Sequence, residues 1–192
     1  KYSADALRFT LLSMASPGRD VKLSEDRVKG YRNFLNKIWN ANNFLIQNDC
    51  KFENIKTPND LKLNINKWIF VEFTNTNEKI KKSIDNYRFD EAARFAYQFV
   101  WHSFCDWYLE LSKTVFYSEN NKNIEETRNV SSFIFTQILV ILHPFIPFLT
   151  EEIWLKNKLD KNGKDFLMLK NWSEASANKD IDSDEVNEII EF

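Results

Sequence analysis

The sequence predicts an all-α helical bundle. Its 192 residues include only 3 Gly and 4 Pro, too few to separate the strands of a many-stranded fold. Between these breakers, apolar residues recur every three or four positions, as along one face of an α-helix. The chain is 43% hydrophobic and 15% aromatic. That composition can fill the core of one large or two small domains, so disorder is not expected.

The net charge of −2 is unevenly distributed. Residues 174–192 hold 7 acids and 1 base, which leaves 25 of the 26 bases and 21 of the 28 acids in the first 173 residues. This mildly basic part fits weak attraction to RNA, but it identifies no partner. No apolar run approaches a membrane span and no signal peptide opens the chain, so we expect a cytoplasmic protein.

Catalytic and metal motifs are missing from the sequence. His102 and Cys105 stand three apart on one expected helix, but two ligands do not make a metal site. There is no glycine-rich phosphate loop, nucleophile elbow or close pair of acids. We therefore expect no metal, no cofactor and no catalytic residue in this chain.

The first helix is expected over residues 3–15. Ser3 is a suitable N-cap, and Asp5 lies in the first turn, where the helix dipole favours an acid. Residues 16–18 should end the helix, and Arg19 in the connector that follows is a candidate phosphate contact, although a solvated charge is commoner. The expected apolar stripe consists of Leu7, Leu11 and Met14.

The second helix should run from a cap at Ser24 to about Gln47. A helical projection puts on its core face Val28, Tyr31, Leu35, Ile38, Trp39, Asn42 and Ile46. It puts on the opposite face Asn33, Lys37, Asn40 and Phe44. Asparagines and a lysine around a spare aromatic ring suit unpaired RNA bases. The alternative is that Phe44 packs under a neighbouring loop.

Two long helices should follow the polar loop 48–59, capped by Asp60 and by Asp90. The second of these should reach about Tyr117. Its expected core face holds Ala93, Ala96, Val100, Phe104, Trp107 and Leu111, and its far side Gln98, His102, Cys105, Leu109 and Phe116. Apolar side chains on that far side indicate a groove or a second contact surface, unless a fifth helix covers them.

A fifth helix is expected over residues 125–142, apolar nearly all round at its end and therefore central there. Pro144 should end it, with His143 in a structural role at the corner. Pro147 should add a bend, after which Thr150 restarts a short helix.

The remaining chain is expected to hold a turn at 160–165, with Gly163 at positive φ. Residues 166–170 form an apolar stretch of irregular or β-like type. Ser183 or Asp182 should cap a last segment. Because the chain begins and stops within helical patterns, we expect a fragment of a longer protein.

Five stretches together resemble valyl-tRNA synthetases, in the order found in that family over roughly residues 1–173. They are ADALRF at 4–9, SPGRD at 16–20, YRNFLNKIWNANNFL at 31–45, WHSFCDWYLELSK at 101–113 and HPFIPFLTEEIW at 143–154. ADALRF and HPFIPFLTEEIW are shared with the isoleucine, leucine and methionine enzymes. FCDWYLE with RNF-x-NK-x-WNA is more particular to the valine enzyme.

The resemblance implies a helical bundle of the class Ia synthetase anticodon-binding type. Residues 1–22 would be the connector after the catalytic domain, residues 23–158 the bundle, and residues 159–192 a tail leading to a C-terminal extension. The nucleotide-binding signatures HIGH and KMSKS and the editing domain do not occur here. The full-length ligase would use ATP with Mg²⁺ and valine, whereas this part would catalyse nothing.

The resemblance also implies which residues bind the anticodon. Lys37, Phe44 and Leu109 fall at anticodon-contact positions, Asn33 matches an asparagine of the methionine enzyme, and Cys105 lies one turn before Leu109. Phe44 would stack on a base, and Asn33, Lys37 and Asn40 would hydrogen-bond base edges or backbone oxygens. Leu109 and Cys105 would form an apolar floor for the central adenine or the cytosine next to it.

One departure concerns Asn43, where many relatives have an arginine. The phosphate contact expected there would be absent or supplied by Lys51 or Arg32. The partner implied is valine tRNA, with no DNA, no membrane and a monomeric protein.

Other functions stay open. The same domain of an isoleucyl- or leucyl-tRNA synthetase would differ in anticodon preference, and a helical protein-interaction module would bind a protein independently of salt. A complete small enzyme has no motif in its favour.

Overall fold

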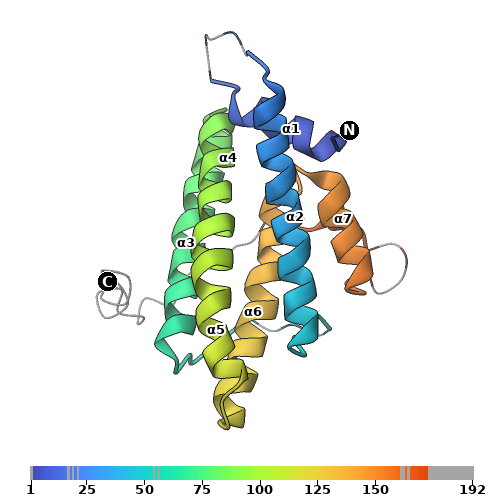
Figure 1. Cartoon of the computed structure of the whole chain (residues 1–192). Helices are drawn as coiled ribbons and strands as arrows, with labels where there is room; N and C mark the ends of the chain where they lie inside the picture. The colour runs from blue at the N-terminus through green and yellow to red at the C-terminus, as the bar shows by residue number, and fades with distance from the viewer. Residues whose placement is uncertain are drawn as a thin grey trace.

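The chain folds into a helical bundle, as predicted. The computed structural model describes residues 2–16, 18, 20, 22–53, 55, 57–160, 163 and 165–172. The regular elements of that part are all helices. Figure 1 shows the long ones side by side: α2 (Glu25–Gln47), α3 (Asn64–Asp85), α6 (Asn121–Leu142) and a rod in which α4 (Phe89–Gln98), η1 (Phe99–Tyr108) and α5 (Leu109–Phe116) follow without interruption.

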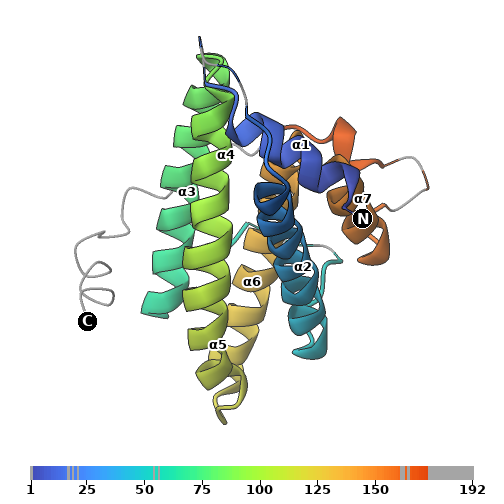
Figure 2. The same ribbon diagram turned by 45° about the horizontal axis from the view of Figure 1, so that its top comes forward.

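Two short helices lie near one end of the bundle, α1 (Ala4–Ser13) across it and α7 (Pro147–Lys156) along the side beside α2 and α6 (Figure 1). Figure 2 shows α1 lying across the top, between the rod and α7. The stretch predicted as irregular or β-like contains η2 (Leu167–Leu169), a single 3₁₀ turn, so no strand forms in it. Gly163 has φ of +65°, as predicted. Arg19 and the segment expected after Ser183 or Asp182 lie outside the described residues.

The core runs along α6, which contacts α2, α3, α5 and α7. Its end was predicted to be central, and Ile134, Ile138 and Leu142 are indeed fully buried. Around them lie large aromatic side chains from the other helices, led by Phe9, Phe34, Phe73, Phe104 and Tyr108. A helix that is apolar on every side is shielded from water only when other helices pack around it.

Local capping signals placed three helix starts. The hydroxyl of Ser3 accepts a hydrogen bond from the Ala6 N–H, and the Ser24 hydroxyl accepts one from Arg27, as predicted. Asn120 caps α6 in the same way, so that helix begins at Asn121 and not at residue 125. A side-chain oxygen at the N-cap satisfies an N–H group that the helix leaves unpaired.

The predicted cap of α3 is wrong, because another helix provides it. The helix begins at Asn64, and Asp60 stands at a positive φ of 60° outside it. The Glu126 carboxylate of α6 accepts hydrogen bonds from the N–H groups of Lys62 at 3.1 Å and Leu63 at 3.0 Å. No local pattern reveals an acceptor that lies more than sixty residues away.

The predicted caps of α4 and α7 also need correction. Asp90 lies in the first turn of α4, where it accepts hydrogen bonds from Arg88 at 3.2 Å and from the Ser16 hydroxyl at 2.9 Å. The Arg88 hydrogen bond lowers the pKa of Asp90 to about 2. Pro147, expected as a bend, begins α7, a position where proline loses no helical hydrogen bond. Thr150 lies inside that helix.

In α1 and α2 the buried face differs from the apolar stripe that the sequence predicted. Leu7 and Leu11 of α1 are 40% and 42% exposed, whereas Ala6 and Phe9 are fully buried. Ile46 of α2 is 42% exposed, and the buried face of that helix centres on Phe34, Ile38, Ala41 and Leu45. Each helix carries more apolar positions than one contact needs, so the neighbours decide which ones are covered.

The π-helix η1 produces the largest difference from the projection. Trp107, predicted in the core, is 47% exposed, while Cys105 and Leu109, predicted on the far side, are buried at 7% and 5%. A π-helix bonds residue i to i+5, so each turn holds more residues than the 3.6 of an α-helix. Ten residues of π-helix therefore rotate every later side chain away from its α-helical position.

Candidate functional site

The predicted binding stripe of α2 faces the rod along what we call the seam, the line where α2 meets η1 and α5. Asn33, Lys37, Asn40 and Phe44 recur at spacings of four and three and therefore share one side of the helix. Lys37 and Phe44 cross the seam and contact the rod. Asn33 and Asn40 are exposed, and neither amide has a hydrogen-bond partner among the described residues.

The first crossing of the seam joins Lys37 to Asp106 of η1 by an ion pair. The Lys37 ammonium also lies 4.3 Å from the centre of the Trp101 ring. His102 Nδ1 is 3.3 Å from the other oxygen of Asp106. The charge of Lys37 is thus already matched in this structure, so a phosphate of RNA would share the ammonium with Asp106.

Sequence reasoning missed Asp106 and Trp101 as parts of this site. The Lys37–Asp106 pair spans 69 residues of chain. The only signal in the sequence was their place in two stretches that share a family resemblance. Which acid pairs with which lysine depends on how η1 is wound and on how the two helices are juxtaposed.

The second crossing joins Phe44 to Phe116 of α5, with ring centres 6.2 Å apart and planes at 48°. Lys113 Nζ lies 5.7 Å from the centre of the Phe44 ring and 2.7 Å from the Glu110 carboxylate. Phe44 is half-buried against a helix. The ring is therefore packed, as in the alternative prediction, but against α5 and not under a loop.

Cys105 and Leu109 lie in the core cluster on the rod side of the seam. Burial raises the pKa of the Cys105 thiol to about 12, although the nearby Lys37 charge acts in the opposite direction. The thiol therefore stays neutral and behaves as a small apolar group. Both side chains are covered by the packed bundle, in which α5 contacts α6, so the floor predicted for them is not exposed in this structure.

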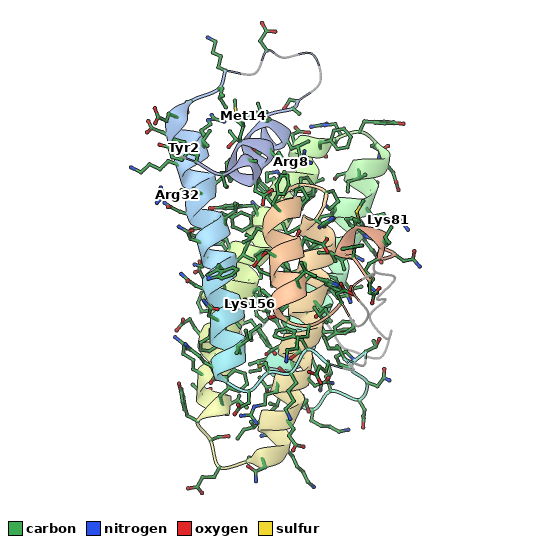
Figure 3. All side chains as sticks on the ribbon, turned by 90° about the vertical axis from the view of Figure 1, so that its right-hand side faces the viewer. Tyr2, Arg8, Met14, Arg32, Lys81 and Lys156 are labelled. Carbon is green, nitrogen blue, oxygen red and sulfur yellow. The ribbon has the colours of Figure 1, made fainter. Side chains whose placement is uncertain are left out.

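Cations lie on the outer side of α2 as well. Arg32 is exposed, and Figure 3 shows it pointing away from the bundle. Lys156 reaches from the end of α7 toward α2, where it donates to Asn43 Oδ1 at 3.1 Å and lies 4.2 Å from the Trp39 ring centre. Lys51 is exposed just beyond the end of α2. A cation therefore stands beside Asn43, but α7 provides it.

Neither histidine forms part of a metal site in the described chain. No group of three or more His, Cys, Asp or Glu side chains there has the arrangement to hold a metal ion. His143 Nδ1 is 2.8 Å from the Thr150 hydroxyl, and burial lowers the pKa of this imidazole. His143 thus ties the end of α6 to α7, the structural role predicted for it. Among the described helices, none has the length and apolarity that crossing a membrane requires.

Comparison with known protein families identifies a family that matches most of the chain. Residues 66–192 match the family described as the anticodon-binding domain of tRNA ligase. The match begins within α3 and covers the described elements after it, including the rod side of the seam.

Curated relatives of this chain are valine–tRNA ligases. That of Pelagibacter ubique (strain HTCC1062) is 65% identical over 190 residues, which are 99% of this chain and 22% of the relative. That of Zymomonas mobilis subsp. mobilis is 44% identical over 191 residues, 95% of this chain and 21% of the relative. The chain thus spans about a fifth of the length of these relatives and resembles them as the sequence motifs predicted.

A solved structure shares the fold. A chain in the ternary complex of Agrobacterium radiobacter K84 agnB2 LeuRS with tRNA and LeuAMS matches with a TM-score of 0.67 at 16% identity. The match covers 91% of this chain and 20% of that one. At this identity the likeness establishes the bundle architecture alone.

Proposed function

Since this chain belongs to the family of anticodon-binding domains of tRNA ligases, we propose that it binds the anticodon stem-loop of valine tRNA as part of a valine–tRNA ligase. The amino acid follows from the names of its relatives. The observation that carries the site is the seam, where an aromatic ring and a lysine lie in line with two exposed amides.

The geometry of the seam suits unpaired bases. Lys37 and Phe44 are seven residues apart on α2, and Asp106 and Lys113 are seven apart on the rod. Seven residues of the α-helix α2 span about 10 Å. Phe44 stacks on one base, while Asn33, Lys37 and Asn40 bind base edges or phosphates. Cys105 and Leu109 are buried behind the seam and would contribute apolar surface only once the seam opens.

Opening of the seam is part of this proposal. Phe44 rests on Phe116, and Lys37 is held by Asp106. A base can stack on Phe44 only on the ring face that Phe116 leaves free, or after the side chain turns. Both aromatic and lysine side chains change rotamer readily on binding, while the helices keep their places.

The division of the chain follows the same proposal. Residues 1–22 connect to a catalytic domain, residues 23–158 form the anticodon-binding bundle, and residues 159–192 lead to a C-terminal extension. ATP, Mg²⁺ and valine would be used in parts of the ligase outside this chain. A ligase of this kind works as a monomer in the cytoplasm.

The test is the affinity of full-length ligase for valine tRNA with Phe44→Ala and Lys37→Ala. Loss of a stacked base costs about 1–3 kcal/mol, which weakens binding of valine tRNA and lowers the preference for its anticodon. Loss of a phosphate contact weakens all tRNAs alike and lowers the salt slope by about one. Tyr117→Ala, an exposed aromatic position beyond the seam, is the matched control.

Two results would contradict the proposal. Unchanged affinity and anticodon preference in both variants would remove the seam from tRNA binding. A preference for isoleucine or leucine anticodons in a swap experiment would assign the domain to a related ligase.

A further inference from the structure

We propose that the outer face of α2 binds the sugar–phosphate backbone of the tRNA, and that Lys156 of α7 holds one of its phosphates. The outer face is the side of α2 formed by Arg32, Asn36, Trp39 and Asn43. The inference rests on the proposed function and adds a contact that lies outside the seam and reads no base.

Two uncharged groups of α2 hold the ammonium of Lys156. It donates a hydrogen bond to Asn43 Oδ1 at 3.1 Å and lies 4.2 Å from the centre of the Trp39 ring. A lysine ammonium has three donors, and the bond to Asn43 uses one of them. The amide and the ring therefore fix the position of the cation and leave donors for a phosphate.

The charge of Lys156 is not matched by an acid. Lys37 in the seam is paired with Asp106. Lys156, by contrast, forms no ion pair with any carboxylate of the described residues, and its residue is exposed. Glu152, one turn earlier on α7, is exposed as well and does not pair with it. A fixed cation without a counter-charge attracts an anion, and lysine is a common ligand of phosphate.

The residue after Lys156 fixes the end of α7 against α2. Asn157 Nδ2 donates to Asn42 Oδ1 at 2.8 Å, and these side chains are buried, with 8% and 0% exposure. The helix α7 is held by α1 and α6 as well. A cation on a helix end held in this way loses little conformational freedom when it binds a phosphate, and such preorganisation favours binding.

The charge of α2 favours a polyanion over its whole length beyond the first turn. Residues 27–47 include no Asp or Glu, and their cations are Arg27, Lys29, Arg32 and Lys37. On the outer face, Arg32 is exposed near one end, and Lys156 reaches Asn43 near the other (Figure 3). These two positions of α2 are eleven residues apart, which is about 16 Å of helix. A backbone with several phosphates can contact both cations without meeting an acid of α2.

The outer face lies beside the binding stripe of the seam. Asn43 directly precedes Phe44, so their side chains leave α2 about 100° apart. An RNA strand whose phosphates follow the outer face can therefore turn its bases toward the seam. Phosphate contacts set the position of the strand and carry no sequence information. Lys156 should thus contribute affinity for every anticodon alike.

The test compares the salt dependence of tRNA binding in full-length ligase as wild type and as Lys156→Gln. Each protein is titrated, between about 0.15 M and about 1 M salt, with valine tRNA and with the same tRNA carrying an altered anticodon. We expect Lys156→Gln to reduce the slope of log affinity against log salt by about 0.7, the contribution of one contact to a single strand, which weakens binding about fourfold at the lower salt. The preference between the two anticodons should stay as in the wild type.

Two further variants separate phosphate binding from a structural role of Lys156. Lys156→Arg keeps the charge and should keep the salt slope. Lys81→Gln removes an exposed lysine of α3, on the side of the bundle away from α2 (Figure 3), and should leave the slope unchanged. The inference is wrong if the slope in Lys156→Gln equals that of the wild type, even where urea denaturation shows a less stable fold.

Two other results would also overturn the inference. An equal reduction of the slope in Lys81→Gln would show a general effect of charge, and a changed anticodon preference in Lys156→Gln would show a base contact. In each of these cases, weakened binding by Phe44→Ala would still leave the proposed function standing.

Discussion

Asp5 and Leu149 stand 144 residues apart in the chain, yet the carboxylate of the first accepts a 2.7 Å hydrogen bond from the backbone N–H of the second. The same carboxylate accepts a bond from the Phe148 N–H at 3.3 Å. Asp5 is 2% exposed and so acts as a buried cap for α7. This contact fixes α1 across the end of the bundle.

Replacing Asp5 by alanine should lower the free energy of unfolding by about 1–2 kcal/mol, because two N–H groups at the start of α7 lose their acceptor. Urea denaturation, monitored by circular dichroism, measures this loss in the free energy of unfolding. Asp20→Ala, in the exposed connector, is the control and should change little. Equal stability of the two variants would contradict the capping role.

The buried hydroxyl of Tyr108 should contribute a similar amount to the free energy of unfolding. It donates to Asn66 Oδ1 at 2.8 Å and lies 3.2 Å from the Ser131 hydroxyl, which joins η1, α3 and α6. Tyr108→Phe leaves a buried acceptor unpaired, so we expect a loss of about 1–3 kcal/mol in urea unfolding. Tyr117→Phe changes a side chain that is 78% exposed and should stay within about 0.5 kcal/mol of wild type.

His143 should make the fold less stable in acid. Burial lowers the pKa of its imidazole in the folded state, whereas an unfolded histidine takes up a proton near pH 6.5. Below about that pH the unfolded chain binds more protons, so stability present at neutral pH declines as the pH falls.

The measurement compares the free energy of unfolding at pH 7.5 and pH 5.5. His143→Gln should reduce the decline between these pH values, because glutamine does not titrate. His102→Gln, whose side chain is 59% exposed, serves as the control. An identical pH dependence in His143→Gln and wild type would show that other groups govern the acid response.

Features that depend on a few neighbouring residues were predictable. Ser3 and Ser24 cap the helices they precede, Gly163 has positive φ, and the end of α6 is central. The stripe of Asn33, Lys37, Asn40 and Phe44 also lies together on α2. Each of these follows from the geometry of one turn or one helix.

Features that depend on distant partners were not predictable. Glu126 replaced Asp60 as the cap of α3, and Asp5 became the cap of α7. Asp106 became the partner of Lys37 only because the two helices lie side by side. Asp106 can be read from the sequence, but its pairing with Lys37 depends on the contact between α2 and η1.

By itself, the sequence determined the helical class, most helix positions and the family, because periodicity, capping residues and ordered motifs are local or linear properties. Only the tertiary structure decided which faces are covered and how the seam is closed. The π-helical winding of η1 turns Cys105 and Leu109 inward and Trp107 outward. The packing of α1, α2 and the rod then selects one of several apolar stripes on each helix. The burial of each residue therefore depends on which other helices pack against it, and not on the spacing of apolar residues along its own helix.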